Sequence, residues 1–302
     1  MARSTIIVLL VMLLIRCASP GHADVQPQKI IGWFNIGYSS RHEGDRMVGR
    51  QIKKTGWKGF VDGTVREQLA AGVRRFQLHN PFGARPNQSM QFDQFLHARD
   101  GGFDWLYADF LPAWKPVILG KYTDGEPVEV IAYLGSLDKG KKITQLVAAG
   151  DVEGYLTRAL ASIQLVRRAG MSIGFDSLGG RDGVVEHDPA YRFVALLESL
   201  DVRVYIEPRP HKEHVHLHRF NIITLDEFWR TTEVHPAASQ WIAPKEQLTG
   251  EIVRILRRPY KNTNWIDSVR RVLRDGHSCA IPFHRLPQGT TVADLIRKDE
   301  SD

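Results

Sequence analysis

The chain has 302 residues, of which 43% are hydrophobic and 25% are charged, and its formal net charge is +6. These values are ordinary for a soluble globular protein, and with only two cysteines they exclude a small disulfide-stabilised scaffold. The basic residues are spread along the chain and form no stripe interleaved with aromatic residues, so we expect no binding to nucleic acid.

The N-terminus carries an apolar run over residues 5–15, which follows Arg3 and precedes the small residues Gly21 and Ala23. The run is too short to span a bilayer as a helix, and its flanks are typical of a cleaved export signal. We therefore predict a signal peptide over residues 1–23 and an exported mature chain, periplasmic or secreted, without stable membrane insertion; an uncleaved anchor is the alternative. Cleavage removes Cys17, which leaves Cys279 without an internal disulfide partner.

The mature chain alternates short apolar runs with amphipathic helical patterns. The runs predict eight strands, at residues 29–38, 73–78, 127–134, 171–180, 202–211, 220–225, 241–244 and 279–283. A helical or irregular connection ends at residues 65–71, and helical patterns cover residues 90–98, 152–169, 189–200, 247–256 and 265–273. This order predicts an α/β protein, a single (β/α)8 TIM-like barrel over residues 24–302. A doubly wound open sheet is the alternative, but no Gly-x-Gly-x-x-Gly motif follows the first strand.

Two carboxylates stand out in this layout. Asp176 directly follows the apolar run of the fourth predicted strand, and Glu207 follows that of the fifth. Because parallel strands present their carboxyl ends on one face, we expect the two acids to lie close together there. A carboxylate that follows a buried run is costly unless it has partners or a solvated pocket, so the pair predicts a catalytic site.

Other polar and aromatic residues also follow the predicted strands, and they form the candidate rim of the site. Aromatic residues such as Trp33 would suit stacking on sugar rings. The predicted substrate-binding residues are Asn35, Tyr38, His79, Asn80, Tyr133, Arg209, His211 and His284.

An Asp after the fourth strand and a Glu after the fifth resemble the layout of retaining TIM-barrel glycoside hydrolases of the α-amylase type. The resemblance implies that Asp176 is the nucleophile and Glu207 the general acid/base. The chain differs from that family at Gly174, where the family has an arginine, and in having no clear third acid after the seventh strand. We expect an exported glycoside hydrolase that acts on a carbohydrate or other small polar substrate and needs no cofactor. Both retention and inversion are compatible with the sequence.

Two other functions remain open. Four histidines between His211 and His218 have spacings that could present imidazoles to a metal, as in metal-assisted phosphodiesterase or amidohydrolase barrels. A solvated loop explains this segment more simply, and we predict no metal site. The third possibility is a barrel that binds a glycan without catalysis, in which Asp176 or Glu207 would pair with Arg181, Arg203 or Arg209.

Overall fold

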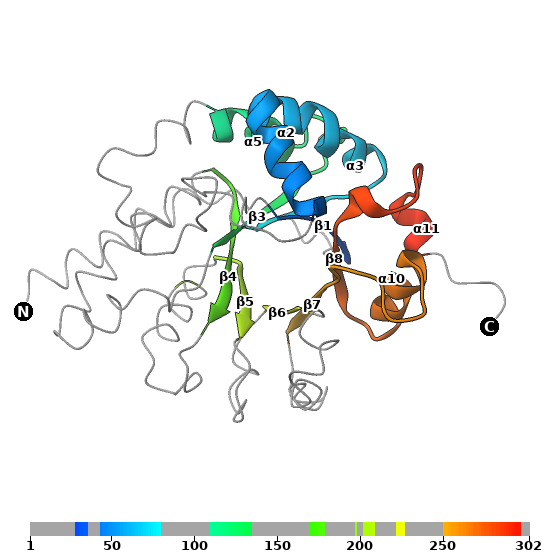
Figure 1. Ribbon diagram of the computed structural model, residues 1–302. Coiled ribbons are helices and arrows are strands. Elements are labelled where there is room, and N and C mark those ends of the chain that lie inside the picture. Colours follow the sequence, from blue (N-terminus) through cyan, green and yellow to red (C-terminus); the bar gives the residue numbers. More distant parts are fainter. Residues whose placement is uncertain are drawn as a thin grey trace, which may run out of the picture.

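The computed structural model describes residues 28–35, 43–79, 109–134, 169–178, 197, 202–208, 222–226 and 250–296 (Figure 1). The described strands are β1 (Ile30–Asn35), β2 (Arg75–His79), β3 (Glu129–Leu134), β4 (Ser172–Leu178), β5 (Val204–Pro208), β6 (Ile222–Asp226), β7 (Glu251–Ile255) and β8 (Ser278–Ile281). The described helices are α2 (Glu43–Phe60), the π-helical η1 (Val61–Val65), α3 (Arg66–Ala70), α5 (Leu111–Ile118), α10 (Trp265–Arg274), the short 3-10 helix η7 (Phe283–Arg285) and α11 (Val292–Ile296).

The strands form a curled sheet in which every pairing is parallel. They neighbour each other in chain order, and β8 pairs back onto β1 at Ile30, Ile31 and Gly32. Neighbouring strands differ in how many residues they pair. Strands β2 and β3 share five register pairs, whereas β5 and β6 share one, Ile206 with Ile223. The register of β4 against β5 also shifts between Phe175 and Leu178.

The predicted (β/α)8 barrel is therefore corrected. We expected a closed (β/α)8 barrel, and the described strands form instead one all-parallel sheet that curls like a half-barrel, in which β5 and β6 share a single register pair. The seventh element was also misplaced, because the segment predicted as a helix at residues 247–256 contains β7. The predicted strand at 241–244 lies outside the described residues, as do the signal peptide over 1–23 and, apart from Leu197, the helices predicted at 90–98, 152–169 and 189–200.

The other seven strands and the helix at 265–273 are confirmed, with ends that differ by a few residues. Most of their sequences are largely apolar, as expected for parallel strands that are buried on both faces, whereas β2 alternates the polar residues Arg75, Gln77 and His79 with apolar ones. Helices α2, α5 and α11 were not predicted from the sequence. Helix α2 is broken at Gly56, where a φ of 68° requires a glycine, and the Trp57 N–H after the break donates to Asp109 Oδ2 at 3.4 Å.

The sheet has two buried faces. On its outer face, Phe34 and Phe76 pack with Phe60, Phe110 and Trp114 from α2, α5 and the residue before α5. Figure 1 shows α2, α3 and α5 together over β1 and β3, and α10 and α11 beside β8. The inner face holds a separate cluster of Ile31, Trp33, Ile131, Tyr133, Tyr205, Ile222, Val253, Ile255 and Ala280.

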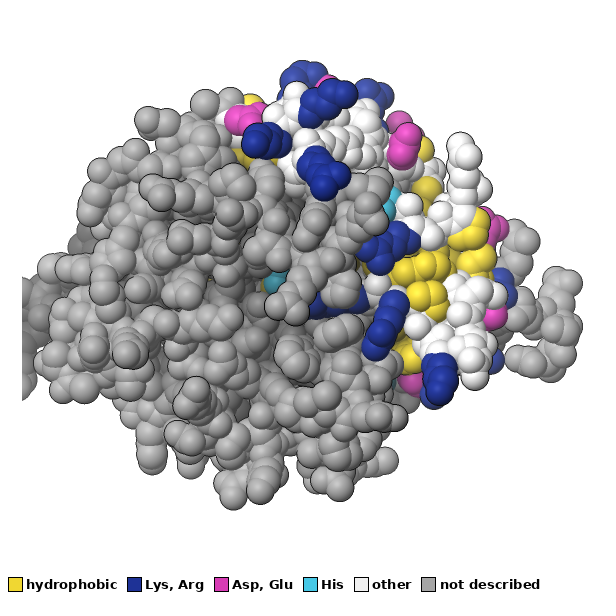
Figure 2. All heavy atoms as spheres, in the orientation of Figure 1, with side chains coloured by type: hydrophobic (Ala, Val, Ile, Leu, Met, Phe, Trp, Pro, Cys, Tyr) yellow, Lys and Arg dark blue, Asp and Glu magenta, His cyan; other side chains and the backbone are white. Residues whose placement is uncertain are grey.

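The described surface is mixed in character. Figure 2 shows Lys and Arg side chains interspersed with acidic, neutral and hydrophobic ones, without one continuous basic stripe over the described part of that face. Within the described ranges, no helix has the length and apolar character needed to cross a membrane.

Candidate functional site

Three predicted substrate-binding residues occupy one row at the carboxyl ends of β1, β2 and β3. Asn35 is in register with His79, and His79 is in register with Tyr133. The His79 and Tyr133 rings stack with centroids 5.2 Å apart, and both side chains are buried. This is the edge at which folds of parallel strands carry their sites.

Trp33 adds an aromatic ring to the inner side of this row. Its ring lies edge-on to the His79 ring at a centroid distance of 6.1 Å. The guanidinium of Arg257, two residues beyond β7, lies 5.5 Å from the indole centroid. Trp33 is only 2% exposed, and its indole N–H is buried together with its ring faces. Sequence reasoning missed Arg257 because it had misplaced β7.

Gly174 shapes the same region from β4. A Cβ atom at this position would lie 2.0 Å from Tyr133 Cδ2, so the Tyr133 ring occupies the space above the glycine. Gly174 is in register with Tyr133 on one side and with Tyr205 on the other. The ring of Tyr133 therefore explains why this position holds a glycine.

The two predicted catalytic residues lie on neighbouring strands. Asp176 belongs to β4 and Glu207 to β5, and these strands pair in parallel. Asp176 falls within the register irregularity between Phe175 and Leu178. Such irregularities are common beside active sites, where they redirect part of a strand.

The remaining predicted residues are not all brought to this row. The His284 ring stacks on Phe34, which belongs to the outer core, at a centroid distance of 6.5 Å. The other predicted substrate-binding residues, Tyr38, Asn80, Arg209 and His211, lie outside the described residues.

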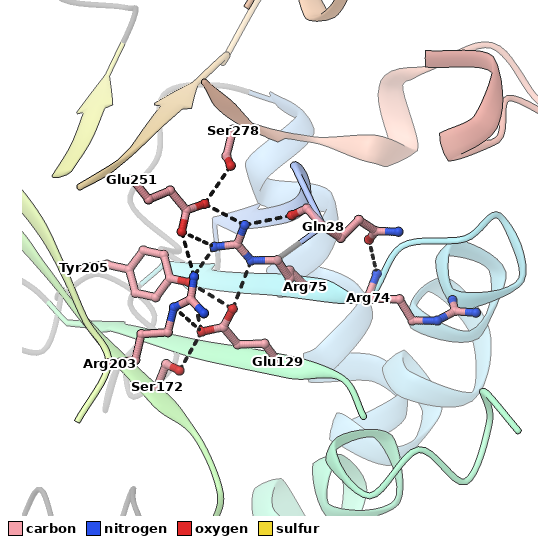
Figure 3. A network of polar contacts seen from close by, with 9 residues as sticks. All are labelled: Gln28, Arg74, Arg75, Glu129, Ser172, Arg203, Tyr205, Glu251 and Ser278. Carbon is pink, nitrogen blue, oxygen red and sulfur yellow. Dashed lines mark hydrogen bonds and ion pairs between the residues drawn. The ribbon is translucent and has the colours of Figure 1, made fainter. Parts of the chain in front are cut away.

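A partly buried ionic network at the amino-terminal ends of the strands was not predicted (Figure 3). Arg75, at the start of β2, pairs with Glu129 at 2.9 Å and with Glu251 at 2.7 Å. Arg203, just before β5, pairs with the same two carboxylates at 3.3 and 2.7 Å. Two arginines thus face two glutamates, and the formal charges of these four side chains balance.

Three hydroxyl groups complete the network. The Tyr205 hydroxyl accepts a hydrogen bond from Arg75 at 2.6 Å and donates to Glu129 at 2.9 Å. Ser172 donates to Glu129 at 2.7 Å, and Ser278 donates to Glu251 at 2.6 Å. These additional hydrogen bonds offset part of the cost of removing the charges from water.

The network shifts the pKa values of its members. Burial disfavours the charged form of Arg75, but Tyr205, Glu129 and Glu251 outweigh burial and raise its pKa. Burial alone would raise the pKa of Glu251, but the charge and hydrogen bonds of Arg75, with the hydrogen bond from Ser278, lower it. Burial, followed by the charge of Glu129, raises the pKa of Tyr205 well above its usual value. Around neutral pH, these shifts favour a charged Arg75 and Glu251 and a neutral Tyr205.

This network lies at the opposite ends of the strands from the row of Asn35, His79 and Tyr133. Groups at the amino-terminal ends of parallel strands commonly serve stability, and structural ion pairs also perturb pKa values. We therefore assign the network to the stability of the sheet and the carboxyl-end row to the candidate site.

Among the described residues, no group of three or more His, Cys, Asp and Glu side chains is arranged to hold a metal ion. The histidine-rich segment from His211 to His218 lies outside those residues. No protein-family model matches this chain, and no curated protein matches its sequence.

Proposed function

We propose that this protein is an exported glycoside hydrolase-like enzyme that uses the carboxylates of Asp176 and Glu207. The observation that carries the proposal is the register of Gly174 with Tyr205 in the β4–β5 pair. Asp176 lies two positions beyond Gly174, and Glu207 lies two positions beyond Tyr205. Because β4 and β5 pair in parallel, both positions lie near the carboxyl ends of neighbouring strands, which is the edge at which folds of parallel strands carry their sites.

The two acids would have different roles. Glycoside hydrolysis needs one carboxylic acid that protonates the leaving oxygen and one carboxylate that attacks the anomeric carbon or activates water. We assign proton donation to Glu207 and the ionised role to Asp176. A partly buried Glu207 beside a charged Asp176 would retain its proton to higher pH, as a general acid requires.

The ionic network supports this assignment indirectly. A purely structural pair of acids would need arginine partners, and Arg203 was one of three candidates for that purpose. Arg203 instead pairs with Glu129 and Glu251 at the amino-terminal ends of the strands. Arg181 and Arg209, the other two candidates, lie outside the described residues.

Export is part of the proposal, and the apolar run over residues 5–15 with its basic start supports it. Intact-mass analysis of the protein from periplasm or medium should give a chain that begins near Asp24. Recovery of only a full-length, membrane-bound chain would contradict export.

A substrate panel tests the activity. The purified mature protein is incubated with α- and β-linked nitrophenyl glycosides of common hexoses, pentoses and N-acetylhexosamines, with and without EDTA. We expect turnover of at least one glycoside, unchanged by the chelator because the acids alone carry the chemistry. Absence of turnover across the panel and across natural oligosaccharides would contradict the proposal, and activity abolished by EDTA would favour the metal-assisted alternative.

A further inference from the structure

Several polar atoms on the inner face of the sheet are buried without a hydrogen-bond partner among the described residues. They are the indole Nε1 of Trp33, both amide atoms of Gln77 and the hydroxyl of Thr224. Trp33 is 2% exposed, and Gln77 and Thr224 are 0% exposed. Buried polar groups in native proteins almost always have partners, so such a set requires an explanation.

Trp33 and Gln77 lie side by side. They are register partners in the β1–β2 pair, and Trp33 belongs to the inner cluster. Phe76 and Leu78, the neighbours of Gln77 along β2, belong to the outer core, so alternation places Gln77 on the inner face. His79 follows two positions later and contacts the Trp33 ring. The unpaired atoms of Trp33 and Gln77 therefore lie directly below the carboxyl-end row.

The chemistry of these atoms indicates what they would bind. Trp33 offers one donor, and the Gln77 amide offers two donors and one acceptor oxygen. A hydroxyl group satisfies both kinds of atom, because it accepts and donates at once. A carboxylate would satisfy the donors but not the amide oxygen, and an apolar group would satisfy none of them.

We propose that Trp33 and Gln77 form a hydroxyl-binding subsite for an uncharged, polyhydroxylated ring, a neutral sugar unit of the substrate. The subsite deepens the proposed glycosidase function and rests on it for the identity of the ligand. Thr224 places a further hydroxyl on the same inner face, from β6. Binding would supply the missing hydrogen bonds to Trp33 and Gln77, and an analogue without hydroxyl groups would be rejected.

The test uses the indole resonance of Trp33 in the mature protein labelled with ¹⁵N-tryptophan. The resonance is identified by its absence in Trp33→Phe. The probes are D-glucose, D-galactose, D-mannose, D-xylose and N-acetyl-D-glucosamine, with tetrahydropyran as a ring that lacks hydroxyl groups. We expect at least one sugar to shift the resonance saturably and tetrahydropyran to leave it unchanged.

Two matched variants separate binding from structure. Gln77→Leu should weaken the binding of that sugar by at least about tenfold. It should leave the thermal midpoint unchanged or higher, because leucine removes unpaired polar atoms at similar volume. The control is Gln68→Leu, because Gln68 is 3% exposed and its amide also lacks a partner among the described residues. A Cβ atom at Gly32 would lie 2.6 Å from Gln68 Oε1 and 2.9 Å from the outer-core ring of Phe76, so Gln68 lies on the outer face of β1, opposite to Trp33. This variant should bind the sugar within about twofold of the wild type.

Three results would overturn the subsite. In the first, no sugar shifts the resonance, which leaves an internal water as the sole partner. In the second, Gln77→Leu lowers the thermal midpoint substantially, which gives Gln77 a structural role, and in the third, both glutamine variants weaken binding equally. Failure of the subsite is distinguishable from failure of the proposed function. Turnover of a glycoside with unchanged KM in Gln77→Leu rejects the subsite alone. Saturable sugar binding that needs Gln77, without turnover of any glycoside, rejects the hydrolase alone.

Discussion

At the residue scale, the inner face between β3 and β4 depends on a large ring packed directly over a glycine. The Tyr133 ring is fully buried, and it contacts His79 on one side and the backbone at Gly174 on the other. The position of His79 in the candidate site is therefore coupled to the absence of a side chain at Gly174.

Gly174→Ala should displace the Tyr133 ring, because the added Cβ would lie 2.0 Å from its Cδ2 atom. We expect the free energy of unfolding in urea to fall by about 1–3 kcal/mol. The control is Gly63→Ala, whose Cβ would meet Gln51 Nε2 at an ordinary 3.7 Å within a helical turn, and which should be neutral or stabilising. Equal stability of Gly174→Ala and the wild type would show that the ring is not held there.

Arg75 is the residue on which the ionic network depends most, since it is 3% exposed and pairs with both carboxylates. Arg75→Met should lower the free energy of unfolding by about 3 kcal/mol, because it removes the buried partner of two partly buried carboxylates. Lys58→Met is the control: Lys58 pairs with Asp62 on the surface with 80% of its side chain exposed, and its loss should have no measurable effect. Similar effects of the two substitutions would refute a stabilising network.

Acid sensitivity should follow from Glu251. Its pKa is lower in the folded protein than the ordinary value of 4.5, so its stabilising contribution is present above that value. The contribution is lost as the pH falls through the lowered, folded-state pKa. Urea unfolding from about pH 7 to about pH 3 should show a loss of stability below the ordinary value, and Glu251→Gln should make this loss shallower. If the wild type and Glu251→Gln lost the same unfolding free energy at low pH, Glu251 would not be the source of the acid sensitivity.

At the element scale, the strands follow from simple patterns where both of their faces are apolar. Seven of the eight described strands were predicted because each is a short buried run. The exception, β7, reads EIVRI, in which the charged residues Glu251 and Arg254 are three positions apart, a spacing that also fits one face of a helix. In the structure, Glu251 enters the ionic network and Arg254 donates to His277 at 2.7 Å, so neither charge marks a solvated face.

Recognition of strands by their apolar runs also explains which parts of the site could be predicted. Asn35, His79 and Tyr133 were found because polar residues after apolar runs mark strand ends. The ionic network was missed because Arg75 and Glu251 lie 176 positions apart, and neither local sequence indicates that the other is its partner. Closure of the sheet into a barrel could not be judged from hydrophobic patterns, because the pairing of β5 with β6 depends on strand register rather than on composition.

Helix α10 shows how local sequence fixes an element boundary. Asn264 caps the helix by accepting a hydrogen bond from the Asp267 N–H at 2.9 Å. Asn264→Ala should lower the free energy of unfolding by about 1 kcal/mol. Asn264→Ser should retain most of the stabilisation, because serine also caps helices. Denaturant unfolding of the two variants checks this, and equal losses would assign the effect to another contact of Asn264.

At the scale of the whole molecule, the parallel sheet separates two tasks between its ends. The amino-terminal ends hold balanced charges that stabilise the sheet, and the carboxyl ends of β1 to β3 hold His79, Tyr133 and the backbone of Asn35. The central claim is that the carboxyl ends of β4 and β5 add a catalytic pair to this second end.

The kinetics of Asp176→Asn and Glu207→Gln test that claim most directly. On the glycoside that the wild type hydrolyses, each substitution should lower kcat/KM by about 10²- to 10⁴-fold without a change in thermal midpoint. Glu207→Gln should retain more activity on nitrophenyl glycosides than on substrates with poor leaving groups, because nitrophenolate needs little protonation, whereas Asp176→Asn should be impaired on both. Wild-type rates in both folded variants would contradict the catalytic pair and, with it, the proposed function.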